Sequence, residues 1–137
     1  MTVLIVEDNA SVCRLIRNIV TGGRENSRMP RWRGGTSGLS QYRPDVVLMD
    51  IEMKELDGIA ATMRIKAAHP AANIIIVTNY DDAELREAAR DAGACGYVLK
   101  HSLLEINDLL QTLSNSNLAR IAETTKLQTL YRCNSRR

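Results

Sequence analysis

Four short apolar runs, each followed by a stretch of helical periodicity, constrain the fold of this chain more than any other feature. We predict strands over residues 3–6, 45–49, 74–77 and 97–99, which are rich in β-branched side chains. Short, continuous apolar strands are typical of a parallel sheet that is buried on both faces. Because these strands alternate with helices, the sequence predicts a doubly wound α/β fold, a parallel sheet with helices on both faces.

The length of 137 residues and the 45% hydrophobic content predict one packed domain. We assign that domain to residues 1–113 and treat residues 114–137 as an extension, with a further helix or a frayed end before a disordered tail. The longest apolar stretch, residues 73–77, is far shorter than a membrane-spanning helix, and the first residues lack a charged signal-peptide start. We therefore expect a cytoplasmic protein that makes no contact with a membrane.

Residues 22–41 are the part of the chain that fits this fold least. They contain neither an apolar run nor helical periodicity, and Pro30 and several glycines oppose a central strand. Residues 22–43 hold five arginines and one acid, so this stretch is strongly basic. A strand and a helix in this stretch are therefore poorly supported. One hypothesis is a shifted reading frame in this stretch, which sequencing of the gene would test.

Polar side chains stand where the predicted strands end. Glu7 and Asp8 follow the first strand, and Asp50 follows the next predicted strand along the chain. Thr78 and Lys100 stand at the ends of the last two strands. Because the carboxyl ends of parallel strands meet at one edge of a sheet, we expect these side chains to form one site.

Three carboxylates in such a site repel one another unless a cation lies between them. Mg²⁺ suits these oxygen ligands, whereas the lack of His or Cys at the strand ends argues against zinc. With the cation bound, Asp50 would be ionised and could attack phosphorus to form an aspartyl phosphate. Lys100 and the Thr78 hydroxyl would then stabilise the phosphoryl oxygens.

Five pieces of the sequence, in their order and spacing, resemble the receiver domains of two-component response regulators. The resemblance covers residues 2–113 and rests on Ile5-Val6-Glu7-Asp8-Asn9, residues 44–53, Asp57-Gly58, Val77-Thr78 and Gly96-Tyr97-Val98-Leu99-Lys100. It implies a flavodoxin-like fold with a five-stranded parallel sheet, in which the second strand and the second helix would fall in residues 22–41. It also implies a single-domain receiver of the chemotaxis type. Such a receiver takes a phosphoryl group from a sensor histidine kinase or a phosphotransfer protein and then presents a changed surface to a downstream protein target. It is no enzyme beyond catalysing its own phosphorylation and dephosphorylation.

The same resemblance gives each site residue a role. It makes Asp50 the phosphoacceptor, and it makes Thr78 and Lys100 the groups that contact the phosphoryl oxygens. The switch residues become Thr78 and Tyr97. It makes the side chains of Glu7, Asp8 and Asp50 ligands of Mg²⁺. The backbone carbonyl of Glu52, two positions after the phosphoacceptor, becomes a further ligand.

Three positions depart from the family pattern. Lys54 and His101 stand where receivers usually carry proline, and Asn79 is larger than the usual alanine or glycine. A cis peptide bond between Lys100 and His101 would cost about 2.5–4 kcal/mol without proline. Either this loop is strained, or the bond is trans and Lys100 is aimed differently.

Two alternatives stay open. A degenerate receiver would act as a phosphorylation-independent protein-interaction domain, and the departures at Lys54, Asn79 and His101 favour it. A phosphatase with an Asp nucleophile would want a second Asp where this chain has Glu52. Because the residues after Leu113 are too few for a helix-turn-helix domain with its own core, we expect no direct DNA binding. We also expect a monomer or a weak dimer.

Overall fold

The computed structural model describes residues 2–22, 44–53, 56–117 and 128–133. The predictions for the second strand and second helix therefore lie outside the described residues, as does the departure at Lys54. The described elements, in chain order, are β1 (Thr2–Glu7), α1 (Ala10–Thr21), β2 (Val46–Asp50), β3 (Glu52–Met53), β4 (Leu56–Asp57), α3 (Gly58–Ala68), β5 (Asn73–Thr78), α4 (Ala83–Ala92), β6 (Gly96–Leu99), a 3₁₀ turn (Lys100–Ser102), α5 (Glu105–Asn117) and β7 (Gln128–Cys133).

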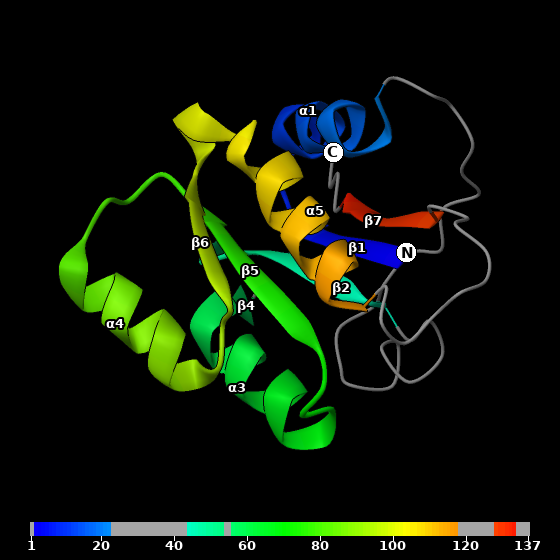
Figure 1. The fold of residues 1–137 in the computed structure, drawn as a ribbon. Helices are drawn as coiled ribbons and strands as arrows, with labels where there is room; N and C mark the ends of the chain where they lie inside the picture. The colour runs from blue at the N-terminus through cyan, green and yellow to red at the C-terminus, as the bar shows by residue number, and fades with distance from the viewer. Residues whose placement is uncertain (1, 23–43, 54–55, 118–127, 134–137) are drawn as a thin grey trace.

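Five of these strands form one parallel sheet in the order β6-β5-β2-β1-β7 (Figure 1). β3 and β4 form a separate antiparallel pair in the loop that follows β2. The predicted α/β fold with a parallel sheet and helices on both faces is confirmed. One strand has an unexpected origin, because β7 comes from the predicted extension.

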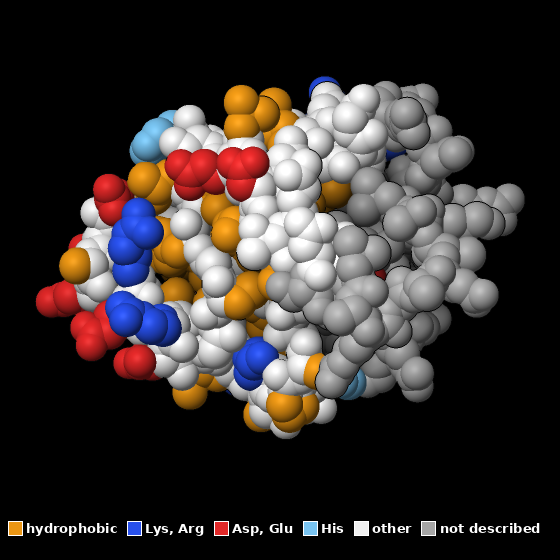
Figure 2. Space-filling model, in the orientation of Figure 1, with side chains coloured by type: hydrophobic (Ala, Val, Ile, Leu, Met, Phe, Trp, Pro, Cys, Tyr) orange, Lys and Arg blue, Asp and Glu red, His pale blue; other side chains and the backbone are white. Residues whose placement is uncertain are grey.

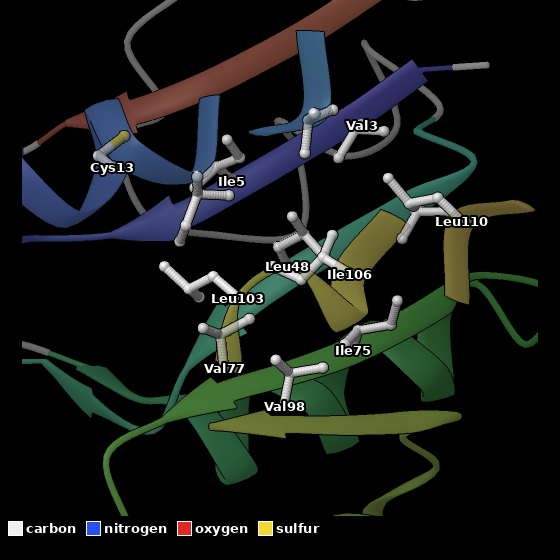
Figure 3. Packing of buried hydrophobic residues seen from close by; sticks show 13 residues of the cluster. Val3, Ile5, Cys13, Leu48, Ile75, Val77, Val98, Leu103, Ile106 and Leu110 are labelled. Atoms are coloured by element: carbon white, nitrogen blue, oxygen red, sulfur yellow. The ribbon is translucent and has the colours of Figure 1, made fainter. Parts of the chain in front are cut away.

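The core lies in two layers, one on each face of the sheet. Successive side chains of a strand point to opposite faces, so Val3 and Ile5 pack with α1 and α5, whereas Leu4 and Val6 pack with α3 and α4. Figure 3 shows the first layer, in which side chains from α5 meet those of β1, β2, β5 and β6. The central strands are buried on both faces, which is why they read as continuous apolar runs.

Local signals in the sequence set the helix ends. Asn9 caps α1, because its side-chain oxygen accepts hydrogen bonds from the backbone N–H groups of Ser11 and Val12 at 3.0 and 3.1 Å. Gly22 and Gly93 follow α1 and α4 with φ angles of 62° and 104°, the left-handed conformation that favours glycine. These caps fix where the chain leaves each helix and returns to the sheet.

The outer side of α4 is densely charged. Basic and acidic side chains gather on the side of the molecule where α4 lies (Figure 2), and Glu84, Glu87, Arg90 and Asp91 are exposed there. Within the part of the chain that the structure describes, none of the helices is long and apolar enough to cross a membrane.

The segment after Leu113 differs from the prediction of a further helix or frayed end. α5 continues to Asn117, and residues Gln128–Cys133 form a strand. The expected helix rested on the spacing of Leu118, Ile121, Leu127 and Leu130. Leu118, Ile121 and Leu127 lie outside the described residues. At Gln128–Cys133 a strand forms by pairing with β1, because strand formation depends on the neighbouring strand more than on local preference.

Candidate functional site

The register of the sheet brings the predicted site residues to one edge. Val6 is aligned with Met49 and Asp50 with Val77, so Glu7 lies beside Asp50 at the strand ends. Thr78 is aligned with Leu99, which places Lys100 one residue beyond Thr78 at the same edge. The polar residues predicted from sequence to meet at the strand ends are therefore gathered there.

Lys100 joins two of these carboxylates. Its ammonium nitrogen lies 2.8 Å from Glu7 Oε2 and 3.3 Å from Asp50 Oδ2. All three residues are largely buried, with side-chain exposures of 14% for Lys100, 2% for Glu7 and 5% for Asp50. No cis peptide bond occurs among the described residues, so the bond between Lys100 and His101 is trans. The missing proline therefore does not keep Lys100 away from the carboxylates.

Glu7, Asp8 and Asp50 form an acidic cluster in which one carboxylate oxygen of each residue lies within 4.8 Å of those of the other two. Glu7 Oε1 accepts a hydrogen bond from the Asn9 backbone N–H at 2.9 Å. Glu7 Oε2 is buried and accepts no aligned hydrogen bond from the described residues, although it is ion-paired with Lys100. A buried carboxylate oxygen with spare acceptor capacity beside two further carboxylates fits Mg²⁺, which binds oxygen ligands.

The environment of Asp50 disfavours its charged form. Burial, followed by the nearby charge of Glu7, raises the pKa of Asp50 from 3.8 to about 7, although Lys100 acts in the opposite direction. Burial likewise disfavours the charged form of Lys100, but the two carboxylates outweigh it and raise the pKa of Lys100. A divalent cation at the cluster would favour ionised Asp50, which is the form that can attack phosphorus.

This arrangement predicts that, without Mg²⁺, the contribution of Asp50 to the free energy of unfolding falls as the pH rises. The folded-state pKa of Asp50 is raised, so folded protein binds the proton more tightly than unfolded protein does. The stabilisation is complete below about pH 4 and is lost as the pH rises through about 7. Asp50→Asn should therefore exceed wild type in stability by roughly 2 kcal/mol at pH 8, and this advantage should shrink toward pH 4.

Urea denaturation across this pH range measures the effect. Asp91→Asn removes an exposed carboxylate on α4 and should follow wild type at every pH. Adding Mg²⁺ at pH 8 should narrow the gap between wild type and Asp50→Asn. An advantage of Asp50→Asn that stays constant across the range would contradict this account of Asp50.

Thr78 and Tyr97 connect the site to the surface around α4. Thr78 is buried, and its hydroxyl oxygen accepts a hydrogen bond from the Tyr80 N–H at 3.2 Å. Tyr97 is half-buried and donates its hydroxyl to the Tyr80 carbonyl at 2.6 Å. Arg86 stacks 4.5 Å from the centre of the Tyr97 ring and pairs with Asp81. Tyr80 thus contacts both predicted switch residues through its backbone.

Glu52 does not join the acidic cluster through its side chain. That side chain is exposed and accepts a hydrogen bond from the Tyr80 hydroxyl at 2.8 Å, which raises the pKa of Tyr80. The role predicted for Glu52 depends on its backbone carbonyl and stays a prediction.

The roles of two residues of the site, Tyr80 and Gly58, were not predicted from sequence. Tyr80 contacts Thr78, Tyr97 and Glu52. The contact with Glu52 joins residues that are 28 positions apart in the chain, so no local sequence pattern predicts it. Gly58 was noted as part of the Asp57-Gly58 pair, yet its packing role was not. A Cβ atom at Gly58 would overlap the carbonyl oxygen of Asp50, so this glycine lets α3 begin directly against the end of β2.

The protein is an α/β protein whose parallel sheet presents an acidic cluster and a paired lysine at its strand ends. Comparison with known sequences shows the family to which it belongs. The chain matches the response regulator receiver domain over residues 3–114 and belongs to that family. It is therefore a receiver domain of two-component signalling.

Three relatives illustrate this membership. The transcriptional regulatory protein ZraR of Salmonella typhimurium is 35% identical over 125 residues, which cover 89% of this chain and 27% of ZraR. A two-component response regulator of the LuxR family from Aurantimonas sp. SI85-9A1 has a TM-score of 0.67 and 26% identity, covering 83% of this chain and 85% of that one. A DNA-binding response regulator of the LuxR family from Staphylococcus aureus has a TM-score of 0.69 over 83% of this chain and 98% of that one; at 24% identity this likeness supports the fold alone.

The name of ZraR contradicts the expectation that the protein does not bind DNA directly. The chain spans about a quarter of the length of ZraR, whose name describes a transcriptional regulator. The prediction of no direct DNA binding was wrong, because it was drawn from the few residues after Leu113, and those residues do not limit what a regulator with this receiver can contact.

Proposed function

We propose that Asp50 accepts a phosphoryl group from a phosphohistidine of a sensor histidine kinase or phosphotransfer protein in the cytoplasm, with Mg²⁺ bound, and that this modification controls a transcriptional regulator. The observation that carries the proposal is the position of the Lys100 ammonium between the carboxylates of Glu7 and Asp50. A cation placed there can stabilise the charge that gathers on a phosphoryl group during transfer. Transcriptional control is proposed from the name of ZraR.

The acidic cluster would hold the metal. Receiver domains generally bind Mg²⁺ at an acidic pocket, and here the side chains of Glu7, Asp8 and Asp50 would supply the oxygen ligands, with the Glu52 backbone carbonyl as a further one. When bound, Mg²⁺ neutralises the carboxylates and withdraws charge from the phosphoryl oxygens.

Phosphoryl transfer then needs few groups of the protein. One carboxylate oxygen of Asp50 attacks phosphorus and forms a P–O bond, while the P–N bond of phosphohistidine breaks and its electron pair stays on the imidazole nitrogen. Lys100 contacts the phosphoryl oxygens. The Thr78 hydroxyl, which accepts a hydrogen bond from the Tyr80 N–H in this structure, has its own proton to donate to the phosphoryl group when it turns toward that group. Apart from this transfer and the hydrolysis of its own acyl phosphate, the domain catalyses no reaction.

The contacts of Tyr80 give the signal a route to the surface. If Thr78 turns toward the phosphoryl group, the hydrogen bond from the Tyr80 N–H to its hydroxyl is lost. The Tyr80 carbonyl holds the Tyr97 hydroxyl, so a shift of Tyr80 changes the position of Tyr97 beside Arg86. Phosphorylation would in this way favour a second packing of the surface formed by α4 and β6.

Incubation with Mg²⁺ and a small acyl phosphate tests the proposal. Intact-protein mass spectrometry should show one added phosphoryl group that is released by mild base, as expected of an acyl phosphate. Asp50→Asn and removal of Mg²⁺ by a chelator should each abolish labelling, whereas Asp91→Asn should label like wild type. Folded wild-type protein that stays unlabelled would overturn the proposal.

A further inference from the structure

β1 is flanked on both edges, and one of its neighbours comes from outside the family match. β2 pairs with one edge, and β7 pairs with the other along the whole strand, from Thr2 opposite Gln128 to Glu7 opposite Cys133 (Figure 1). In sheets of the order 2-1-3-4-5, the second strand of the chain stands beside the first. Among the described residues, that place is held by Gln128–Cys133, which lies beyond the matched residues 3–114.

β1 is a strand that requires a neighbour at this edge. Its residues Val3 to Val6 are at most 2% exposed. Without a neighbour, one row of backbone N–H and C=O groups in this buried strand would have no partner from the sheet, and buried backbone groups without partners are costly. Residues 22–41 offer no apolar run to fill the edge, whereas Thr129 and Tyr131 are residue types that favour strands.

The same pairing reaches the acidic cluster. Glu7 is the last residue of β1 and is aligned with Cys133, so the ladder with β7 extends to the backbone of Glu7. The Glu7 side chain then accepts a hydrogen bond from the Asn9 N–H and faces the Lys100 ammonium. The position of β7 and the position of the Glu7 carboxylate are therefore linked, because the Glu7 backbone belongs to the ladder with β7.

We propose that the outer edge of β1 is a strand-binding site for residues 128–133 of the same chain, and that filling it holds Glu7 in place beside Asp50 and Lys100. The linkage is reciprocal, as any coupling between two sites must be. A cation bound at the acidic cluster stabilises the pairing of β7, and the pairing of β7 strengthens binding of the cation.

Amide hydrogen exchange followed by NMR tests this site in the full chain. The test variant carries Thr129→Pro and Leu130→Pro together, because alternate residues of a parallel strand face a given neighbour and one of these two must donate toward β1. Ser135→Pro with Arg136→Pro is the matched control, since the same change lies two residues beyond β7. In the test variant, the amides of β1 that donate toward β7, every second one of residues 2–7, should exchange at least about tenfold faster than in the control.

The Asn9 amide reports the position of Glu7, because it donates to the Glu7 carboxylate. It should exchange faster in the test variant, whereas the amides of β6, at the opposite edge of the sheet, should be unchanged. Unaltered exchange at residues 2–7 would overturn the strand-binding site. Faster exchange there with an unaltered Asn9 amide would overturn the link to Glu7.

Wild-type protein provides a measurement that needs no folded variant. Every second amide of residues 128–133 should be protected about as strongly as those of β1, and uniformly rapid exchange would overturn the proposal. Protection that weakens on dilution, together with a dimer in sedimentation, would also overturn it, because the strand would then come from a second copy.

A Mg²⁺ titration separates this proposal from the proposed function. The dissociation constant for Mg²⁺ should be at least about fivefold larger in the test variant than in the control. Wild type that fails to bind Mg²⁺ would contradict the proposed function, while the exchange of residues 2–7 and Asn9 would still decide the strand-binding site.

Discussion

Lys100→Met is expected to lower the free energy of unfolding at pH 8 by about 3–5 kcal/mol, because removing one member of a buried ion pair leaves its partners uncompensated. In this protein two carboxylates would be left, since the ammonium lies 2.8 Å from Glu7 and 3.3 Å from Asp50. Lys100 lowers the pKa of Asp50, so its loss raises that pKa further. The loss of stability should therefore shrink as the pH falls and Asp50 takes up a proton.

The same variant should slow phosphorylation of Asp50 by a small acyl phosphate by about 100-fold, the usual effect of removing one group that stabilises transition-state charge. Stopped-flow or quench-flow rates and urea denaturation measure the two effects. Lys100→Arg keeps the charge but not the compact ammonium, and should recover much of the stability and less of the rate.

Lys66→Met is the matched control. It removes an ammonium that donates to the backbone carbonyls of Pro70 and Ala72, away from the strand ends. It should cost about 1 kcal/mol at every pH and leave the phosphorylation rate unchanged. If Lys100→Met and Lys66→Met prove alike in rate and in pH dependence, the role given to Lys100 is wrong.

The parts of the fold that could be predicted are those with a local signature. β1, β2 and β5 read as apolar runs because both of their faces are buried, and Gly93 marks the end of α4 because its φ of 104° suits glycine. β7 has no such signature. Its residues mix polar and apolar types, and its partner β1 lies more than a hundred residues away, so its strand forms through pairing that no local window contains.

Some contacts of the site could likewise be predicted from local sequence, and others could not. Glu7, Asp50 and Lys100 could be placed together because each ends a recognisable strand, and strand ends of a parallel sheet share one edge. The contact between the Tyr80 hydroxyl and Glu52 depends on how two loops pack, so sequence could not give it. The mistaken expectation about DNA had another origin, since it was drawn from chain length and not from the chemistry of any residue.

Gly58 shows how tightly the site depends on packing of the backbone. Its N–H donates to the Ile51 carbonyl at 3.0 Å, and its carbonyl accepts from the buried Thr62 hydroxyl at 2.7 Å. A Cβ atom added at Gly58 would overlap the Asp50 carbonyl oxygen and would lie 2.9 Å from the Ile51 Cα. Both obstacles are backbone atoms, so no side-chain rotation can relieve the overlap, and either α3 or the end of β2 must move.

Gly58→Ala should therefore lower the free energy of unfolding by about 3 kcal/mol, near the upper end of what overpacking costs. It should also slow phosphorylation of Asp50 by more than about tenfold, because a displacement of the attacking carboxylate of even 1 Å costs rate. Gly96→Ala is the control: its Cβ would meet only side-chain atoms of Leu109 and Ile75, at 3.2 Å and beyond. That change should cost about 1 kcal/mol, the lower end of what overpacking costs, and leave the rate near wild type. Denaturation and labelling curves for Gly58→Ala that overlay those of Gly96→Ala would show that β2 and α3 are not packed as described, and that Asp50 is not held by the start of α3.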